Sequence, residues 1–386
     1  MLTNDYFIEI AHKSIQKNGN EVCGDVFLSK KLYDEGRTIS VLSDGLGSGI
    51  KANVLATLTA SMALNFTIEH QPLERSSQSI KSTLPIDQTR KISYATFSIV
   101  DIEYDNEISI VEYGNPPFMV FRGSSLLKEI NKTNLKSDIK RCSFGAQRED
   151  RIILFSDGVS QSGIGRADMP FGWELEDIEN FISDLLIDNP RISAEELSKK
   201  IVSKALSNDS LVAQDDISCI VIYFRKPRNL LICSGPPYKP EKDKLIADTI
   251  KCFDGNKIIC GGTTAQIISR ELKLEIETDL YSGDSQLPPI SHMNGIDLVT
   301  EGILTIGKVA EFLESGKHLS SQNPAGKIIK YILSNDHIKF IIGTKINDAH
   351  QDPTLPVELE IRRNVIKKIA YILKEKYLKD VDIQFI

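Results

Sequence analysis

The 386-residue sequence predicts an α+β fold in which antiparallel sheets carry helices on their outer faces, followed by a smaller α/β domain. The first observation is the order of elements up to residue 225: strands, two helices, strands, two helices and a strand. The second is a change in the order of elements after residue 229, where single strands alternate with helices. The third is the phrase Ser-Asp-Gly, which ends apolar runs at 43–45 and 156–158 and places two carboxylates at strand ends.

The elements of the first part follow from hydrophobic period and turn signals. The run 39–43 is rich in β-branched residues and stops at Asp44-Gly45, which is typical of a buried strand that ends in a turn. Runs bounded by turn residues predict strands over 6–12, 26–28, 39–43, 92–100, 107–114, 118–121, 151–156 and 215–224. Apolar residues at helical spacing predict helices over 50–66, 73–84, 174–186 and 194–206. Ser193 and Glu196 form a capping box at the start of the last helix.

The second part begins after a predicted linker at 226–229, which divides the chain into domains 1–226 and 229–386. Its strands are predicted over 230–233, 257–260, 273–276 and 296–299, with helices between them. An amphipathic helix over 357–377 closes the chain. This alternation predicts a small α/β domain.

Composition limits the class of protein. The chain is 41% hydrophobic and 26% charged, and its net charge of −7 argues against nucleic acid or an anionic membrane as the main partner. No apolar stretch is long enough for a transmembrane span, and the first residues lack the pattern of a signal peptide. The six cysteines are scattered without a Cys-x-x-Cys pair, so we expect reduced core thiols and a cytoplasmic protein.

Five acids flank predicted strand ends: Asp25, Asp44, Asp157, Asp215 and Asp216. In an antiparallel arrangement the end of one strand lies beside the start of another, so all five can meet at one edge. Carboxylates gathered in a low-dielectric site repel one another, and divalent cations remove that cost. An all-oxygen ligand set suits Mg²⁺ or Mn²⁺. Two such ions would lower the pKa of a shared water and clamp a phosphoryl group for in-line attack.

These residues form a motif series that resembles a known family. Asp25, Asp44-Gly45-x-Gly47-x-Gly49, Asp157-Gly158-Val and Asp215-Asp216-Ile-Ser are similar to the motifs of metal-dependent PPM-type serine/threonine phosphatases, and most closely to the bacterial SpoIIE-like branch. The resemblance covers roughly residues 1–225. It implies a β-sandwich flanked by helices (α-β-β-α) and phosphoserine or phosphothreonine protein substrates. In that family the usual substrates are small regulatory proteins such as anti-anti-sigma factors.

The resemblance also implies a role for each acid. By position, Asp44 would bridge two Mn²⁺ or Mg²⁺ ions, and Gly45 would contribute its carbonyl oxygen. Asp157 and Asp215 would ligate the first ion, and Asp25 would hold water of the second. These acids are the expected catalytic and metal-binding residues.

Two positions leave questions open. Either Asp215 or Asp216 can be the metal ligand, and we prefer Asp215. Leu46 stands where many eukaryotic members carry a histidine just after Asp-Gly, so no histidine is placed to protonate the leaving serine oxygen. Our hypothesis is that a metal-bound water supplies that proton.

The Asp44 loop does not match the two common nucleotide-binding motifs. It fails the Walker A pattern because 49–52 lacks Gly-Lys-Ser/Thr, and it fails the Rossmann fingerprint because Ile50 occupies the third glycine position. A plain strand-to-helix turn explains one Asp-Gly but not four matching sites. The alternative function is a catalytically silent scaffold that binds phosphoproteins.

The second domain carries one further candidate site. Gly261-Gly262-Thr263-Thr264 lies between a predicted strand and a helix, where exposed amides and two hydroxyls form an anion site. Alternatively, Thr263 or Thr264 is the N-cap and the glycines serve the turn, which is the interpretation we prefer. The segment 297–302 repeats the strand-then-glycine pattern and could face the same edge. We expect this domain to be regulatory.

Overall fold

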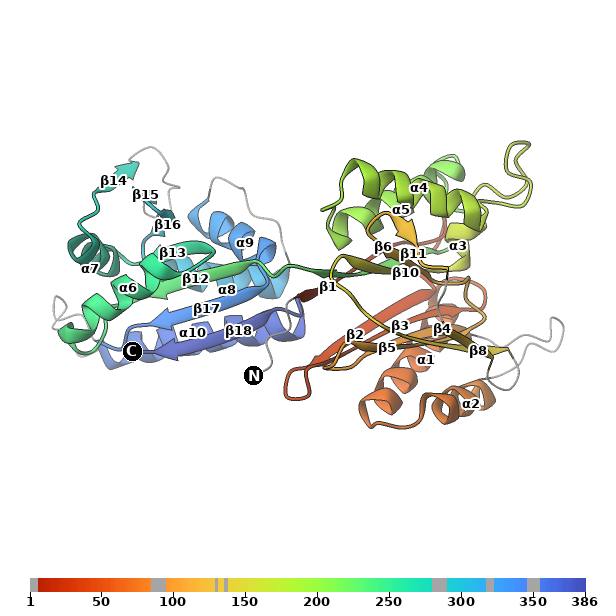
Figure 1. The fold of residues 1–386 in the computed structure, drawn as a ribbon, viewed down its shortest axis with the longest axis horizontal. Helices are drawn as coiled ribbons and strands as arrows, with labels where there is room; N and C mark the ends of the chain where they lie inside the picture. The colour runs from red at the N-terminus through yellow and green to blue at the C-terminus, as the bar shows by residue number, and fades with distance from the viewer. Residues whose placement is uncertain are drawn as a thin grey trace. The chain divides into compact units, whose positions relative to one another are not determined.

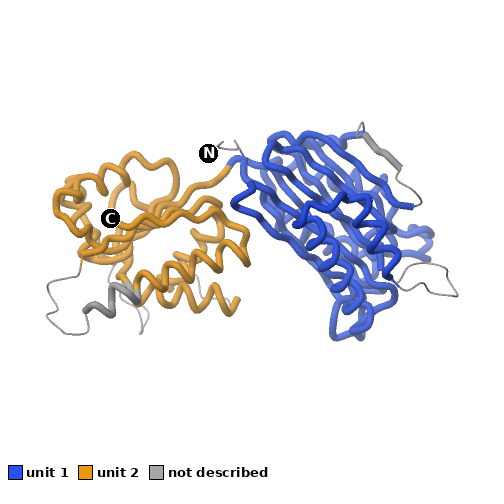
Figure 2. Tube along the Cα trace, turned by 90° about the horizontal axis from the view of Figure 1, so that it is seen from below, with its two compact units in different colours: residues 1–226 blue, residues 227–386 orange. Residues whose placement is uncertain are grey.

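The computed structural model describes residues 6–84, 95–128, 131–134, 138–279, 290–316, 323–345 and 355–386. The chain divides into two compact units, Met1–Lys226 and Pro227–Ile386 (Figure 2). Each unit has its own sheets and its own hydrophobic core.

The first unit is a sandwich of two antiparallel sheets (Figure 1). The five-stranded sheet has the order β1-β11-β10-β6-β7, with β1 (Phe7–Ile15), β11 (Ile217–Arg225), β10 (Asp150–Phe155), β6 (Met119–Arg122) and β7 (Ser125–Leu126). The six-stranded sheet has the order β2-β3-β4-β5-β9-β8, with β2 (Asp25–Leu32), β3 (Arg37–Gly45), β4 (Ala95–Ile102), β5 (Glu107–Tyr113), β9 (Ile139–Gly145) and β8 (Asn131–Asn134). Side chains from both sheets meet in one core, to which Val100, Ile152 and Ile220 belong.

Helices cover both outer faces of the sandwich. Helices α1 (Ile50–Ile68) and α2 (Leu73–Thr83) pack on the six-stranded sheet. Helices α4 (Leu175–Asp188) and α5 (Ala194–Asn208) pack on the five-stranded sheet. This α-β-β-α arrangement confirms the fold class predicted for the first part. Ser193 is the N-cap of α5, as predicted, and its hydroxyl accepts a hydrogen bond from the Glu196 amide at 3.1 Å.

Strand β11 shows why the central strands read as continuous apolar runs. All nine of its residues are buried, because one face meets the other sheet and the other face meets helices. Ile220 and Ile222 point into the core of the sandwich, whereas Cys219 and Val221 pack under α4 and α5. A strand covered on both faces has no polar side, so it loses the alternation typical of a half-exposed strand.

Helix α1 packs through small side chains. Ala52, Ala56, Ala60 and Ala63 form its buried face and bring its backbone close to the sheet. Some of its larger apolar side chains, such as Val54 and Leu58, are exposed. The sequence predicted the helix correctly from its apolar pattern, but which apolar residues face the sheet was decided by the close approach to β3.

Some elements of the first unit were not predicted. Strands β7, β8 and β9 fall in a region where the sequence predicted no strand, because they are short or mix polar with apolar residues. The predicted helices agree with the structure to within two residues at each described end. The first residues of the strand predicted at 92–100 lie outside the described residues, and β4 begins at Ala95.

The second unit is a three-layer α/β unit. Its seven-stranded sheet has the order β14-β15-β16-β13-β12-β17-β18, with β14 (Ile276–Asp279), β15 (Ile290–Met293), β16 (Ile296–Thr300), β13 (Asn256–Cys260), β12 (Asn229–Ser234), β17 (His337–Ile342) and β18 (Asp380–Phe385). The five strands from β16 to β18 are parallel. One face packs against α6 (Asp243–Cys252) and α7 (Gly262–Leu272). The other packs against α8 (Ile303–Ser315), α9 (Pro324–Ser334) and α10 (Leu355–Glu375).

Two predictions for this unit need correction. The strand expected over 273–276 is wrong, because Lys273 adopts the left-handed conformation that ends α7, and β14 begins only at Ile276. The preferred reading of Thr263 or Thr264 as a helix N-cap is also wrong. The N-cap of α7 is Gly261, and no side chain caps the helix. The glycine has φ of 125°, which an L residue rarely adopts.

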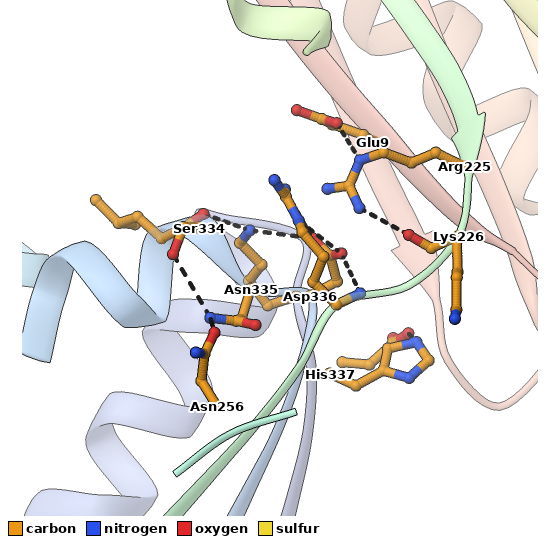
Figure 3. Close-up of polar contacts among 12 residues, drawn as sticks. Glu9, Arg225, Lys226, Asn256, Ser334, Asn335, Asp336 and His337 are labelled. Atoms are coloured by element: carbon orange, nitrogen blue, oxygen red, sulfur yellow. Dashed lines mark hydrogen bonds and ion pairs between the residues drawn. The ribbon is translucent and has the colours of Figure 1, made fainter. Parts of the chain in front are cut away.

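Buried charges hold strand ends within each unit (Figure 3). In the first unit, Arg225 at the end of β11 pairs with Glu9 on β1. In the second unit, the fully buried carboxylate of Asp336 accepts a hydrogen bond from the Arg228 amide at 2.8 Å, just before β12. Lys379 Nζ lies 3.7 Å from the same carboxylate, just before β18. Through these contacts, Asp336, just before β17, holds the starts of β12, β17 and β18 next to one another.

No described helix is both long and apolar enough to cross a membrane. Four cysteines are buried as expected, but Cys252 is exposed and Cys23 is only half-buried, so the expectation of core thiols holds in part.

Candidate functional site

Two of the predicted acids face each other across neighbouring strands. In the pairing of β2 with β3, Asp25 lies directly opposite Asp44. Asp25 begins its strand and Asp44 is the penultimate residue of its own, so both lie at the same edge of the six-stranded sheet. Like charges directly opposite each other destabilise an antiparallel pair. Placing Asp25 opposite Asp44 therefore lowers the stability of the fold, and the pairing of the two strands does not require acids at these positions.

The other acids lie directly beside the ends of strands of the five-stranded sheet. Asp157 begins the short helix α3 (Asp157–Ser160) directly after β10, and Asp215 and Asp216 lie directly before β11. Ser156 connects these two places: its hydroxyl accepts from the Ser218 amide at 3.0 Å and donates to the Asp216 carbonyl oxygen at 3.3 Å. The serine of the second Ser-Asp-Gly phrase thus holds the end of one strand beside the start of the next.

A pocket of about 700 Å³ brings acids from both sheets together. Asp44 from one sheet and Asp157 and Asp215 from the other line it, with Gly45 and Leu46 beside them. The two Ser-Asp-Gly phrases, distant in sequence and on different sheets, therefore meet at one site.

Asp25 and Asp216 lie outside the lining of this pocket. Both are buried, with exposed fractions of 5% and 4%. The backbone amide of Lys17 donates to Asp216 Oδ1 at 2.9 Å, whereas Asp215 faces the pocket. The two adjacent acids therefore lie in different environments: Asp215 lines the pocket, and Asp216 is buried beside it.

Three glycines allow these segments to approach closely. A Cβ on Gly45 would lie 2.2 Å from the Ala52 carbonyl oxygen, and one on Gly158 would lie 2.1 Å from the Asp216 carbonyl oxygen. A Cβ on Gly24 would lie 2.8 Å from Asp216 Oδ2. A side chain at Gly45 or Gly158 would push apart the backbone segments that carry the acids, and one at Gly24 would displace the Asp216 carboxylate.

Burial and crowding raise the pKa values of the carboxyl groups at this site. Burial raises the pKa of Asp25 to about 7, although the nearby Ser218 and Ser156 hydroxyls oppose the shift. Burial, followed by the charges of neighbouring acids, raises the pKa of Asp44 well above its usual value. The pKa of Asp157 is raised for the same reasons. Without a cation, the site therefore favours protons over free negative charge.

The chemistry of the donors fits divalent cations. Both carboxylate oxygens of Asp25 and Oδ2 of Asp216 are buried without a hydrogen-bond partner, an arrangement that is unfavourable unless something else pairs with them. The oxygen-only set suits Mg²⁺ or Mn²⁺. In the described part of the chain, no three acidic, histidine or cysteine side chains already surround one metal position. The side chains would therefore have to turn toward a bound ion.

Sequence reasoning missed several residues that line the site, of which Lys17 and Gln161 contact the predicted acids. Lys17 lines the pocket, and its Nζ lies 3.8 Å from Asp215 Oδ1. Gln161 Nε2 donates to Asp157 Oδ2 at 3.0 Å. The spacing of four residues between Gln161 and Asp157 could have indicated a shared helix face. No local signal could have indicated Lys17, which is 199 residues from Asp216 in sequence.

Leu46 stands where a histidine acid would be expected, so the environment of His12 decides whether this histidine could donate the proton instead. The His12 ring stacks on Phe27 with ring centres 5.1 Å apart, and its Nε2 is buried without a partner. Burial lowers the pKa of His12 to about 4. Leu46, which lines the pocket, cannot donate a proton.

The family model described as stage II sporulation protein E (SpoIIE) matches residues 34–225. These residues form a SpoIIE-like phosphatase domain. The SpoIIE match includes Asp44, Asp157, Asp215 and Asp216, whereas Asp25 precedes it. A comparison with curated protein sequences found no match.

Three solved structures illustrate what the chain is similar to. The PP2C phosphatase domain of SpoIIE from Bacillus subtilis, with a fragment of its regulatory domain, has 19% identity and a TM-score of 0.48, covering 57% of this chain and 62% of that chain, which is less than two thirds of it. The RsbU and RsbW domains of Rv1364c from Mycobacterium tuberculosis have 14% identity and a TM-score of 0.47, covering 63% and 67%. RsbX in complex with magnesium has 20% identity and a TM-score of 0.40, covering 57% and 96%. At these identities the similarity concerns the fold alone.

Proposed function

We propose that the SpoIIE domain is a metal-dependent protein phosphatase that hydrolyses phosphoserine or phosphothreonine on a regulatory protein. The match to the SpoIIE family model supports protein phosphatase activity in general. The observation that carries the proposal is the meeting of Asp44, Asp157 and Asp215, from two different sheets, at one pocket. A purely structural turn would not require carboxylates to be placed together at such a cost.

The residues divide into roles by position. We propose that Asp44, near the end of β3, would be a ligand shared by two Mn²⁺ or Mg²⁺ ions, with the Gly45 carbonyl oxygen as a further ligand. Asp157 and Asp215 would hold the first ion, and Asp25 would hold water near the second. When bound, the ions would lower the pKa of a water molecule and neutralise charge on the phosphoryl oxygens.

Neighbouring residues position these acids. Gln161 Nε2 donates to one oxygen of Asp157 and so fixes the orientation of this carboxylate. Lys17 lies close enough to Asp215 to orient it, and its positive charge at the pocket favours a phosphorylated substrate. For the substrate, we propose an anti-anti-sigma-like regulator. A cytoplasmic location, a bacterial origin and a regulatory second domain stay predictions.

Hydrolysis of p-nitrophenyl phosphate, followed by a phosphoserine peptide, tests the proposal. We expect turnover by the full chain with Mn²⁺ or Mg²⁺, loss of turnover after chelation with EDTA, and recovery when the metal is added back. The catalytically silent scaffold would instead bind the phosphopeptide without releasing phosphate. Release of phosphate that persists in EDTA would contradict the metal-dependent mechanism.

A pH–rate profile tests the absence of a histidine acid. Since burial lowers the pKa of His12 to about 4, this side chain is neutral across the neutral pH range. We therefore expect His12→Ala to leave the shape of the profile of kcat/KM unchanged. If an acidic limb near a histidine pKa disappeared in His12→Ala, the hypothesis that no histidine acts as the acid would be wrong.

A further inference from the structure

Two helices of the second unit begin at neighbouring strand ends. Helix α7 follows β13 and helix α8 follows β16, and these two strands pair in parallel. The helices lie on opposite faces of the sheet (Figure 1). Both therefore start at the carboxyl edge of the parallel strands, which is where α/β sheets commonly bind ligands.

The two starting points are in contact. The N-cap residues are Gly261 for α7 and Gly302 for α8. A Cβ on Gly302 would lie 3.6 Å from the Gly261 Cα, and the Gly261 amide donates to the Thr300 carbonyl oxygen at 2.7 Å. Because each helix N-terminus carries a partial positive charge, the meeting of two concentrates that charge at one place.

Neither helix start is capped by a side chain. In α7 the first helical hydrogen bond runs from the Ala265 amide to the Gly261 carbonyl oxygen, at 3.0 Å. In α8 it runs from the Ile306 amide to the Gly302 carbonyl oxygen, at 3.3 Å. The amides before Ala265 and Ile306 in each first turn therefore have no partner from helical bonding. Gly262, in the first turn of α7, is exposed at the surface.

Each first turn also contains a buried threonine. Thr264 and Thr305 are both the third residue of their helix, and their exposed fractions are 2% and 1%. Among the described residues, the Oγ1 atoms of both are buried without a hydrogen-bond partner. Thr264 Oγ1 points back to the helix start, since it would lie 3.5 Å from a Cβ on Gly261. A buried hydroxyl without a partner in each first turn is costly unless a ligand pairs with it.

We propose that the joined starts of α7 and α8 bind a tetrahedral oxyanion, either inorganic phosphate or the phosphate group of a small ester. Its oxygens would accept hydrogen bonds from the amides of both first turns and from the hydroxyls of Thr264 and Thr305. The exposed carboxylate of Glu301 is a neighbour that opposes an anion, since its Oε1 would lie 3.7 Å from a Cβ on Gly262. This site is independent of the phosphatase activity proposed for the first unit.

The test is phosphate binding by the full chain and by the double variant Thr264→Val, Thr305→Val. Valine keeps the shape and β-branching of threonine and removes only the hydroxyl. We expect titration calorimetry with inorganic phosphate, in EDTA to exclude metal-bound phosphate in the first unit, to show at least about tenfold weaker binding by the double variant. Without phosphate, thermal unfolding of the variant should be unchanged or shifted upward, because the hydroxyls have no partner to lose.

A matched control and a second variant complete the test. Thr249→Val makes the same change on α6, where the hydroxyl donates to the Leu245 carbonyl oxygen, and phosphate affinity should not change. Glu301→Gln removes the opposing charge and should tighten phosphate binding about threefold. Parallel titrations with glucose 6-phosphate and with glucose distinguish free phosphate from an ester.

Three results would overturn the proposal. The first is the absence of binding of either phosphate probe to the wild-type chain. The second is equal phosphate affinity in the wild type and the double variant. The third is a double variant that unfolds at lower temperature without phosphate, which would show that the hydroxyls are bonded within the fold. If the double variant did not fold, unchanged phosphate affinity in Glu301→Gln would count against a phosphate at Gly262.

Discussion

Asp44→Asn should lower kcat/KM for phosphate ester hydrolysis about a thousandfold or more, while the metal-free protein becomes more stable. The loss of activity follows because Asp44 lies where both sheets contribute acids, and an amide cannot carry the charge that holds cations there. The gain in stability follows because burial and neighbouring acids raise the pKa of Asp44, so its ionised form is unfavourable in the folded state. We expect a gain of roughly 1 kcal/mol at pH 8 in EDTA.

The pH dependence of stability has a definite sign here. A carboxyl group whose pKa is raised on folding binds its proton more tightly in the folded state, so its contribution to stability is lost as pH rises through the folded pKa. With Asp25 at about 7, the metal-free wild type should lose stability between about pH 4 and pH 7. Urea unfolding in EDTA across this range, for the wild type and Asp44→Asn, measures the effect, and the variant should lose less.

A control variant separates the site from general charge effects. Asp184 is an exposed acid on α4, so Asp184→Asn should leave both activity and its metal dependence unchanged. Asp157→Asn should reproduce the loss of activity seen in Asp44→Asn. Metal-dependent turnover that survives in either site variant would end the assignment of these acids as ligands.

Gly158→Ala should destabilise the first unit by about 3 kcal/mol or more and abolish activity. A Cβ at this position would lie 2.1 Å from the Asp216 carbonyl oxygen, and this backbone cannot move aside as a flexible side chain could. Separation of the two backbones would also move Asp157 away from Asp215, which line the same pocket. Chemical denaturation and p-nitrophenyl phosphate turnover measure the two effects.

The matched substitution is Gly145→Ala at the end of β9. There a Cβ would meet only the Glu107 side chain, at 3.6 Å, which is ordinary contact. We expect this variant to keep stability within about 0.5 kcal/mol and full activity. Equal stability of Gly158→Ala and the wild type would show that the close packing around Asp216 is not what holds the acids together.

The sequence predicted what depends on neighbours along the chain. The apolar run before Asp44 and the capping pair Ser193–Glu196 are local signals, so the strand and the helix start that they indicate are both found. Strand β9 was missed because its mixture of polar and apolar residues, including Arg141 and Ser143, has no clear period. The N-cap of α7 was misassigned because Gly261, Thr263 and Thr264 are all acceptable near a helix start, and only the backbone conformation distinguishes them.

By itself, the sequence determined the chemistry of this protein: which carboxylates follow or precede strands, and where glycines leave room beside them. Only the tertiary structure decided that Asp44 and Asp157 lie at strand ends of different sheets, that Asp25 lies opposite Asp44, and that Lys17 reaches Asp215. The same holds for the contact of Gly261 with Gly302. The reason is physical: period and capping act within a few residues, whereas pairing register and sheet packing depend on contacts between segments that the chain order does not bring together.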